Sequence, residues 1–203
     1  MTRPVVLTAD QRGSRRGPDA VPALLERLAA LRPAPLRAFE RTAGDEVQGV
    51  LDDAGAVVAA VTALADDGRW SVGVGLGPVR TPLPASTRAG AGVAFEAARR
   101  AVEAAKRVRE GVAVRGGPDD GDPVPAVVDA ETALLLLVDL RRRRSAAGRE
   151  VVRLVEEGLP AGRAAERLGV TPQAVSQRLA AARWSSEQRL VPLAVRLVAA
   201  AAG

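Results

Sequence analysis

Two aspartates stand at comparable places in the chain, each beside a segment typical of a β-strand. Asp10 ends the apolar run PVVLTAD (4–10), and Asp45 lies in a Gly-Asp-Glu corner between LRAFERTA (36–43) and VQGVL (47–51). Two carboxylates held together repel each other unless a proton or a cation lies between them. Mg²⁺ is commonly bound by one or two carboxylates together with substrate phosphates. We therefore expect Asp10 and Asp45 to meet at one end of a sheet and hold a metal ion.

The segment QRGSRRGPD (11–19) separates Asp10 from an expected helix. Backbone N–H groups and cationic side chains ahead of a helix N-terminus favour anions. Ser14 is interpreted as a loop or capping residue, because no His or Lys base is evident beside it. The expected contacts to an anionic ligand are Arg12, Gly13, Ser14, Arg15 and Asp45.

A simpler interpretation of Asp45 exists. Gly-Asp is common turn chemistry, and an Asp side chain in a turn often accepts hydrogen bonds from nearby backbone N–H groups. Under that interpretation Asp45 only shapes a hairpin. The roles of Glu46 and Gln48 stay open between supporting the site and facing solvent.

The composition excludes several classes of site. The chain has 203 residues with no Cys and no His, which excludes disulfides, thiol nucleophiles, His-based triads and His-ligated zinc. Aromatic residues make up 2%, too few for the stacking surfaces that bind single-stranded nucleic acid. The longest apolar run, TALLLLV (132–138), is far short of a membrane span, and the N-terminus does not resemble a signal peptide. We expect a cytoplasmic protein without a membrane partner.

The order of expected elements is strand, helix, strand, turn, strand, helix, strand, helix, strand, followed only by helices. This order indicates the α+β class, with a mostly antiparallel sheet of the ferredoxin-like or split βαβ kind. In such a sheet the first two strands are expected to lie side by side. The strand RWSVGVGLGPV (69–79) alternates apolar residues with Ser and Gly, so its second face lets something approach the backbone closely. The expected divisions are residues 1–117, a linker and connector helix at 118–144, and a helical domain at 145–203.

The helical domain carries the most specific motif. AGRAAERLG (161–169) predicts a short helix with a Gly turn, Thr171 an N-cap, and Pro172 the first residue of a second helix. This is the helix-turn-helix pattern, in which polar residues early in the second helix face DNA bases and arginines face phosphates. An ordinary helical pair with a solvated Arg face is the alternative. The expected DNA contacts are Arg163, Arg167, Thr171, Gln173, Ser176, Gln177, Arg178 and Arg183.

Charge agrees with a nucleic-acid partner for this domain alone. Residues 141–203 hold 12 arginines against 5 acidic residues, a net charge of +7, whereas residues 1–140 carry −2. The run RRRR (141–144) either contacts phosphates or is solvated. The helix at 187–203 either covers the helical domain or forms a dimer, and the helix at 126–144 is a second candidate for dimerisation. Double-stranded DNA and a second copy of the chain are the expected partners.

The N-terminal segments VVLTADQRGSRR, GDEVQGVL, WSVGVGLGPV and GAGVAFEAARRA, followed by a helix-turn-helix, resemble the SatD-like family of bacterial regulators over residues 4–115. Their layout is also similar to class III nucleotidyl cyclase domains. That resemblance implies that Asp10 and Asp45 bind metal ions with a nucleoside triphosphate and that Arg99 contacts phosphate. The Asn that partners this Arg in cyclases falls at Phe95 here, a departure that favours binding over turnover.

The sequence therefore predicts a DNA-binding transcriptional regulator whose cyclase-like domain senses a nucleotide or other phosphorylated ligand, with Mg²⁺. One alternative is a divergent nucleotidyl cyclase or nucleotide hydrolase with a DNA-binding tail. Another is a degenerate cyclase-like domain that only dimerises.

Overall fold

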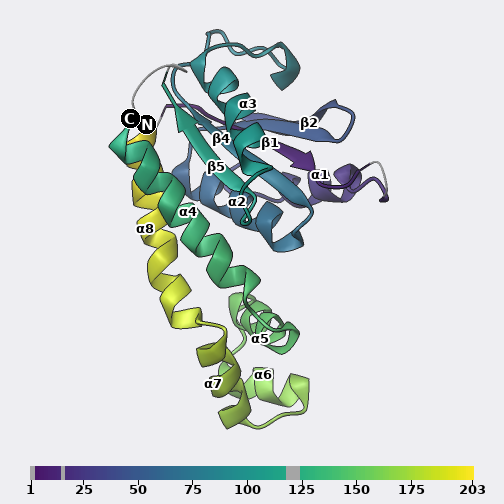
Figure 1. Cartoon of the computed structure of the whole chain (residues 1–203). Coiled ribbons are helices and arrows are strands. Elements are labelled where there is room, and N and C mark those ends of the chain that lie inside the picture. Colours follow the sequence, from purple (N-terminus) through teal and green to yellow (C-terminus); the bar gives the residue numbers. More distant parts are fainter. Residues whose placement is uncertain (1–2, 15–16, 118–123) are drawn as a thin grey trace.

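The computed structural model describes residues 3–14, 17–117 and 124–203 and confirms the α+β class. Figure 1 shows a sheet with helices on both faces, from which two long helices extend to a small group of helices. The described elements are β1 (Val5–Gln11), α1 (Val21–Ala29), β2 (Arg37–Ala43), β3 (Glu46–Leu51), α2 (Ala54–Asp67), β4 (Trp70–Leu76), the 3₁₀ turn η1 (Thr87–Ala89), α3 (Val93–Ala105), β5 (Val112–Gly116), α4 (Pro125–Arg142), α5 (Ala146–Glu156), α6 (Ala161–Leu168), α7 (Pro172–Ala181) and α8 (Trp184–Ala202).

The five strands form one mixed sheet in the order β2-β3-β1-β4-β5. The pairs β2–β3, β3–β1 and β1–β4 are antiparallel, and β4–β5 is parallel. The expected succession of elements is confirmed, but the expectation that β1 and β2 are neighbours is wrong. The hairpin places β3 between them, because a short turn at residues 44–45 folds β3 directly back onto β2 and β3 then pairs with β1.

Both faces of β1 and β4 are buried. β1 accordingly reads as a nearly continuous apolar run, whereas β4 alternates apolar residues with Ser and Gly. Helices α1 and α2 cover one face together with part of α4, and α3 covers the other. The glycine face of β4 is confirmed as a place of close approach. A Cβ atom on Gly75 would lie 2.1 Å from the carbonyl oxygen of Ala94, and one on Gly73 would lie 2.2 Å from the backbone N of Val102. The approaching group is therefore α3 itself.

The two long helices α4 and α8 run side by side, as Figure 1 shows, and α8 also packs on α2. Ala194, Val198 and Ala202 of α8 belong to the main core beside Leu134 and Leu137 of α4. The helix expected at 187–203 therefore covers the sheet-bearing part of the chain rather than only the helical domain. The two candidates for dimerisation bury their apolar faces on each other. We call the sheet with α1, α2 and α3 the body, and α5–α7 (146–181) the distal unit.

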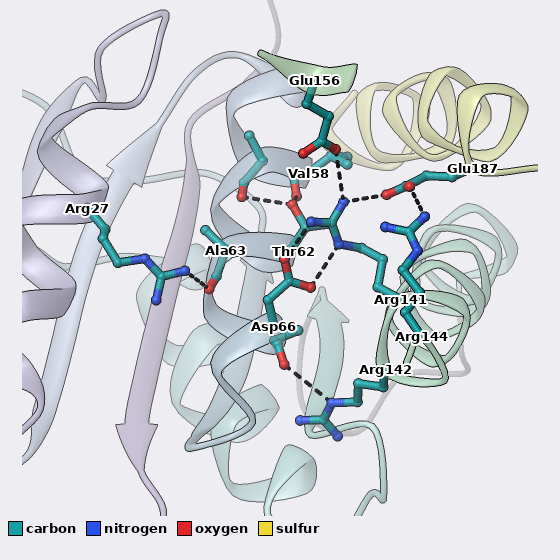
Figure 2. A network of polar contacts seen from close by, with 12 residues as sticks. Arg27, Val58, Thr62, Ala63, Asp66, Arg141, Arg142, Arg144, Glu156 and Glu187 are labelled. Carbon is teal, nitrogen blue, oxygen red and sulfur yellow. Dashed lines mark hydrogen bonds and ion pairs between the residues drawn. The ribbon is translucent and has the colours of Figure 1, made fainter. Parts of the chain in front are cut away.

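A buried charge network joins the body to the distal unit (Figure 2). Glu187 of α8 is 1% exposed and forms ion pairs with Arg141 and Arg144. Arg144 is also buried and donates through Nε to the carbonyl oxygen of Ala182, 2.9 Å away and directly after α7. Arg141 donates to Asp66 of α2. The network thus ties α2, α4, α8 and the end of α7 together.

The arginine run 141–144 makes contacts within the molecule, and of its four residues Arg143 is also exposed to solvent, as one of the two expected roles has it. Beyond the network, Arg142 donates to the carbonyl oxygen of Arg109 at 2.8 Å, and Arg143 pairs with Asp139 at 2.6 Å. Burial opposes the charge of Arg141, but the hydrogen bonds and charges of Asp66 and Glu187 outweigh it and raise the pKa of Arg141. The guanidinium groups of the run already have hydrogen-bond partners within the chain.

Within residues 3–14, 17–117 and 124–203, none of the helices combines the length and the apolar character that crossing a membrane requires.

Candidate functional site

Asp10 and Asp45 line the same pocket at one end of the sheet. Asp10 is paired with Glu46 across β1 and β3, and the backbone N–H of Gln11 donates to the carbonyl oxygen of Asp45 at 3.2 Å. The two expected site residues therefore meet through the β2–β3 turn, although β2 itself is not a neighbour of β1. The pocket is open and has a volume of about 700 Å³, within the usual range for small-ligand sites. Its lining consists of Asp10, Gln11, Arg12, Gly13, Ser14, Asp45, Ser71 and Lys106.

Asp45 faces open space at the end of the sheet. Its side chain lines two adjoining pockets that share Gln11 and Ser14. The charge of Asp45 acts on Asp10 and raises its pKa.

Lys106 is the functional residue that sequence reasoning missed. It is the only Lys in the chain, and it follows α3, whose C-terminal end lies beside the end of β1. Its Nζ is 3.4 Å from Oδ2 of Asp10 and 2.7 Å from Oε1 of Glu103. The expectation that no Lys lies near Ser14 is wrong, because both residues line one pocket. Only the rarity of Lys in an Arg-rich chain could have marked it.

The pKa values in the pocket follow from this geometry. Burial raises the pKa of Asp10 most, Lys106 opposes the rise, and Asp45 adds to it. The hydrogen bond to Glu103 raises the pKa of Lys106 despite partial burial, and the charge of Asp10 adds to the rise. Lys106 is therefore a fixed cation near neutral pH. It suits an anionic ligand and cannot serve as a base for Ser14.

Arg12 holds the loop to α3 instead of facing the pocket freely. Its Nε donates to Oγ of Ser71 at 3.0 Å, and its Nη2 donates to the carbonyl oxygens of Ala105 and Val108 at 3.4 and 3.3 Å. A cation at the C-terminal end of a helix satisfies carbonyl groups that the helix leaves unpaired. Burial lowers the pKa of Arg12, and the charge of Arg142 adds to this. Arg12 thus holds the residues after β1 against α3, and its guanidinium group already has hydrogen-bond partners within the chain.

The remaining residues of the loop after β1 differ in their contacts. Gly13 has φ +70°, a left-handed conformation that a side chain would strain, and Ser14 lines the pocket. Arg15 lies outside the described residues. Gln11 is buried and bridges the two ends of the loop, donating to the carbonyl oxygen of Pro18 at 2.8 Å and accepting from the N–H of Ala20 at 2.9 Å. Its side chain, which the sequence did not mark, joins β1 to the residues just before α1.

Arg99 does not join this site. It is exposed on α3, seven residues before Lys106, which corresponds to about 10 Å along a helix. It is not part of the pocket lining. Gln48 is internal as well, since its Nε2 donates to Oγ1 of Thr8 at 2.9 Å and only 5% of the residue is exposed. Lys106 and Arg12, not Arg99, are cations in the pocket lining.

The donor set for a metal ion is small. In the described part of the chain no group of three or more acidic residues that could hold a metal is found. Two carboxylates, Asp10 and Asp45, share the pocket. They fit Mg²⁺ bound together with phosphate and water oxygens, since Mg²⁺ commonly takes only one or two protein carboxylates.

The second candidate site lies on α6 and α7. Gly169 ends α6 with φ +62°, the Oγ1 of Thr171 accepts from the N–H of Ala174 at 3.2 Å, and Pro172 begins α7, as expected. Val151, Ala165 and Val175 form the core that holds α5, α6 and α7 together. The two helices are thus joined by a turn of three residues with a left-handed Gly.

The side chains on this surface are mostly accessible. Exposed residues are Arg163, Arg167, Thr171, Gln173, Ser176, Gln177 and Arg183, whereas Arg178 is half-buried. Arg163 is paired with Glu166 at 2.6 Å, and Oγ of Ser176 donates to the carbonyl oxygen of Pro172 at 3.1 Å. Gln173 and Gln177 therefore carry the freest amide groups at the start of α7.

Comparison of the chain with protein-family models, with curated proteins and with solved structures gave no match.

Proposed function

We propose that the chain is a DNA-binding transcriptional regulator in which α6 and α7 form a helix-turn-helix. The observation that carries the proposal is α7 itself, capped by Thr171 after a left-handed Gly169, with Gln173 and Gln177 exposed near its start. The early residues of a recognition helix face base edges in the major groove, where Gln pairs with adenine. The net charge of +7 on residues 141–203 favours the same partner, although the arginines at 141–144 are engaged internally.

A palindromic operator with two half-sites fits this proposal, and one chain presents one α7. Two copies are then required. Exposed apolar residues remain on the outer faces of the paired long helices: Val128 and Leu136 on α4, and Leu193 on α8. These residues support the dimer as part of the proposal.

Replacing Gln173 and Gln177 together by Ala is expected to weaken binding to the operator at least tenfold, because each amide pair to a base contributes about 1–3 kcal/mol. Binding to unrelated DNA should stay unchanged, since phosphate contacts carry it. A mobility-shift titration on the region upstream of the gene, at several salt concentrations, measures both. Gln188→Ala, an exposed Gln on α8, is the matched control. Equal binding of the double variant and the wild type to the operator would show that α7 does not recognise bases.

The proposal assigns a ligand to the pocket of Asp10, Asp45 and Lys106. The strand order β2-β3-β1-β4 with one helix after β1 and one after β3 supports a ferredoxin-like, cyclase-like domain of the kind that the SatD-like resemblance implies. A nucleotide or other phosphorylated ligand fits a pocket with a fixed ammonium, a serine hydroxyl and a loop backbone around Gly13. Asp10 and Asp45 would hold Mg²⁺ against the same phosphate.

Lys106→Gln is expected to weaken binding of such a ligand roughly tenfold, because a hydrogen bond from a charged group contributes about 1.5–3 kcal/mol. Thermal melting of the full chain with nucleoside triphosphates and Mg²⁺ measures this, since bound ligand raises the melting temperature. Arg107→Gln, which removes an exposed cation next in sequence, should retain the full shift. If Lys106→Gln responds like the wild type, Lys106 does not contact the ligand. If no nucleotide shifts the wild type, the domain does not sense nucleotides.

The same samples distinguish a sensor from an enzyme. Two carboxylates in one pocket are the observation that favours a nucleotidyl cyclase or hydrolase as the second candidate. Product formed from a nucleoside triphosphate with Mg²⁺ or Mn²⁺, and lost in Asp45→Asn, would establish turnover. Binding without product supports the sensor.

A further inference from the structure

A second cavity lies where the body, α8 and the distal unit meet, and it shares no lining residue with the sheet-end pocket. It has a volume of about 390 Å³ and is lined by residues of α2, α4, α5 and α8. Its walls are largely aliphatic, and the indole of Trp184 contributes to them. The aliphatic residues are Val58 and Ala59 of α2 and Val191, Pro192 and Val195 of α8.

The polar side of this cavity is formed by part of the buried charge network. Arg141, Glu187 and Glu156 line it, and Figure 2 shows Glu156 pointing toward Arg141. The charges of the network do not balance. Two arginines, Arg141 and Arg144, face three carboxylates, those of Asp66, Glu187 and Glu156. One negative charge is therefore left over.

Glu156 is the carboxylate of the three that forms no hydrogen bond with Arg141 or Arg144. Asp66 and Glu187 take the hydrogen bonds of Arg141, whereas Oε1 of Glu156 is 3.9 Å from its Nη1, beyond hydrogen-bond distance. The Glu156 side chain is 43% exposed, so it can still be reached. Burial raises the pKa of Glu156, Arg141 opposes the rise, and the charge of Glu187 adds to it. A partly desolvated carboxylate on the wall of an apolar cavity lacks a full partner.

We propose that this cavity binds a small organic cation with an apolar body, whose ammonium group lies against Glu156 and whose apolar groups contact Val58, Val191 and Trp184. An anion is disfavoured, because the lining already carries one negative charge in excess. The indole adds attraction for a cation, since cations bind aromatic faces within about 6 Å of the ring centre. A ligand here contacts α2, α5 and α8 together, so it links the distal unit to the body.

Phenyltrimethylammonium and tert-butylbenzene test the proposal, because they have nearly the same shape and differ in charge. Isothermal titration of the full chain should show the cation binding at least tenfold more tightly than the neutral compound. The fluorescence of Trp184 should change on binding. No binding of the cation at millimolar concentration, or equal affinity for both compounds, would overturn the proposal.

Two variants locate the site. Glu156→Gln should remove the preference for the cation while leaving the affinity for tert-butylbenzene unchanged, and the neighbouring Glu157→Gln should retain the preference, since Glu157 is exposed and paired with Arg153. Ala59→Phe, at an exposed position of α2 that lines the cavity, should weaken binding of both compounds at least tenfold by filling the space. A preference for the cation that survives in Glu156→Gln, or cation binding of wild-type affinity in Ala59→Phe, would place the binding elsewhere and refute the assignment.

Discussion

Glu187→Ala is expected to lower the free energy of unfolding by about 3–5 kcal/mol, the usual cost of removing one partner from a buried ion pair. Arg144 has a side chain that is 3% exposed, and without Glu187 its charge keeps a hydrogen bond to the carbonyl oxygen of Ala182 but no carboxylate. For a chain of this size the melting temperature should fall by about 10 °C. Calorimetry or circular dichroism with denaturant measures the change.

The matched control is Glu157→Ala. Glu157 also forms an ion pair with an arginine, Arg153 at 2.6 Å, but both side chains are about half exposed. Exposed pairs contribute about 1 kcal/mol or less, so this variant should melt close to the wild type. Equal and small losses in both variants would mean that the buried network does not hold the distal unit on the body.

Gly75→Ala is expected to destabilise the body by about 3 kcal/mol or more. The added Cβ would lie 2.1 Å from the carbonyl oxygen of Ala94 and 2.4 Å from the backbone N of Ala98. Both are backbone atoms of α3, so the helix must move away from β4 as a unit, and forcing extra volume into a packed core commonly costs about 1–3 kcal/mol. Denaturant unfolding monitored by circular dichroism measures the loss.

Gly162→Ala adds the same methyl group where nothing lies within 4 Å. Gly162 is in α6, and Ala is favoured over Gly in helices by up to about 1 kcal/mol. Its free energy of unfolding should therefore be unchanged or slightly raised. A Gly75→Ala protein as stable as Gly162→Ala would show that α3 does not pack on β4 as described.

The parts of the fold that the sequence predicts correctly are those fixed by residues close together in the chain. The α6–α7 turn is local, since Gly169, Thr171 and Pro172 lie within four residues and each has a conformational reason to be there. The strand and helix order follows from periodicity in the same local way. The neighbours of β1 could not be read off, because pairing depends on residues far apart in the sequence.

The same reasoning separates the residues of the sheet-end pocket. Asp10 and Asp45 were found because each stands at a strand end with turn chemistry beside it. Lys106 was not, because its place depends on how α3 packs antiparallel to β4 and ends near β1. Arg12 lines the same pocket, but its hydrogen bonds to the carbonyl oxygens of Ala105 and Val108 could not be predicted from its type and loop. An arginine in a loop satisfies whichever carbonyl groups folding brings near.

The arginine run 141–144 shows that net charge alone does not tell how many arginines are accessible to DNA. The run 141–144 supplies four of the twelve arginines that make residues 141–203 basic, and Arg141, Arg142 and Arg144 contact Asp66, Glu187 or backbone carbonyls. Net charge describes the chain, whereas a DNA partner meets only the outward groups. Arg167 and Arg183 on the distal unit are among those that remain outward.

Because α8 follows α5–α7 in the chain, the ribosome synthesises α8 only after the entire distal unit. Ala194, Val198 and Ala202 complete the main core against α2 and α4, so those faces stay uncovered on the nascent chain until the last of these residues has left the ribosome. Glu187 arrives at the same time, and until then Arg144 and Arg141 have no buried carboxylate from α8. The distal unit, whose own core of Val151, Ala165 and Val175 is local in sequence, can fold first. The core of the body is thus completed by α8, and ribosome pausing between α7 and α8 should hold the body in an open, chaperone-accessible state.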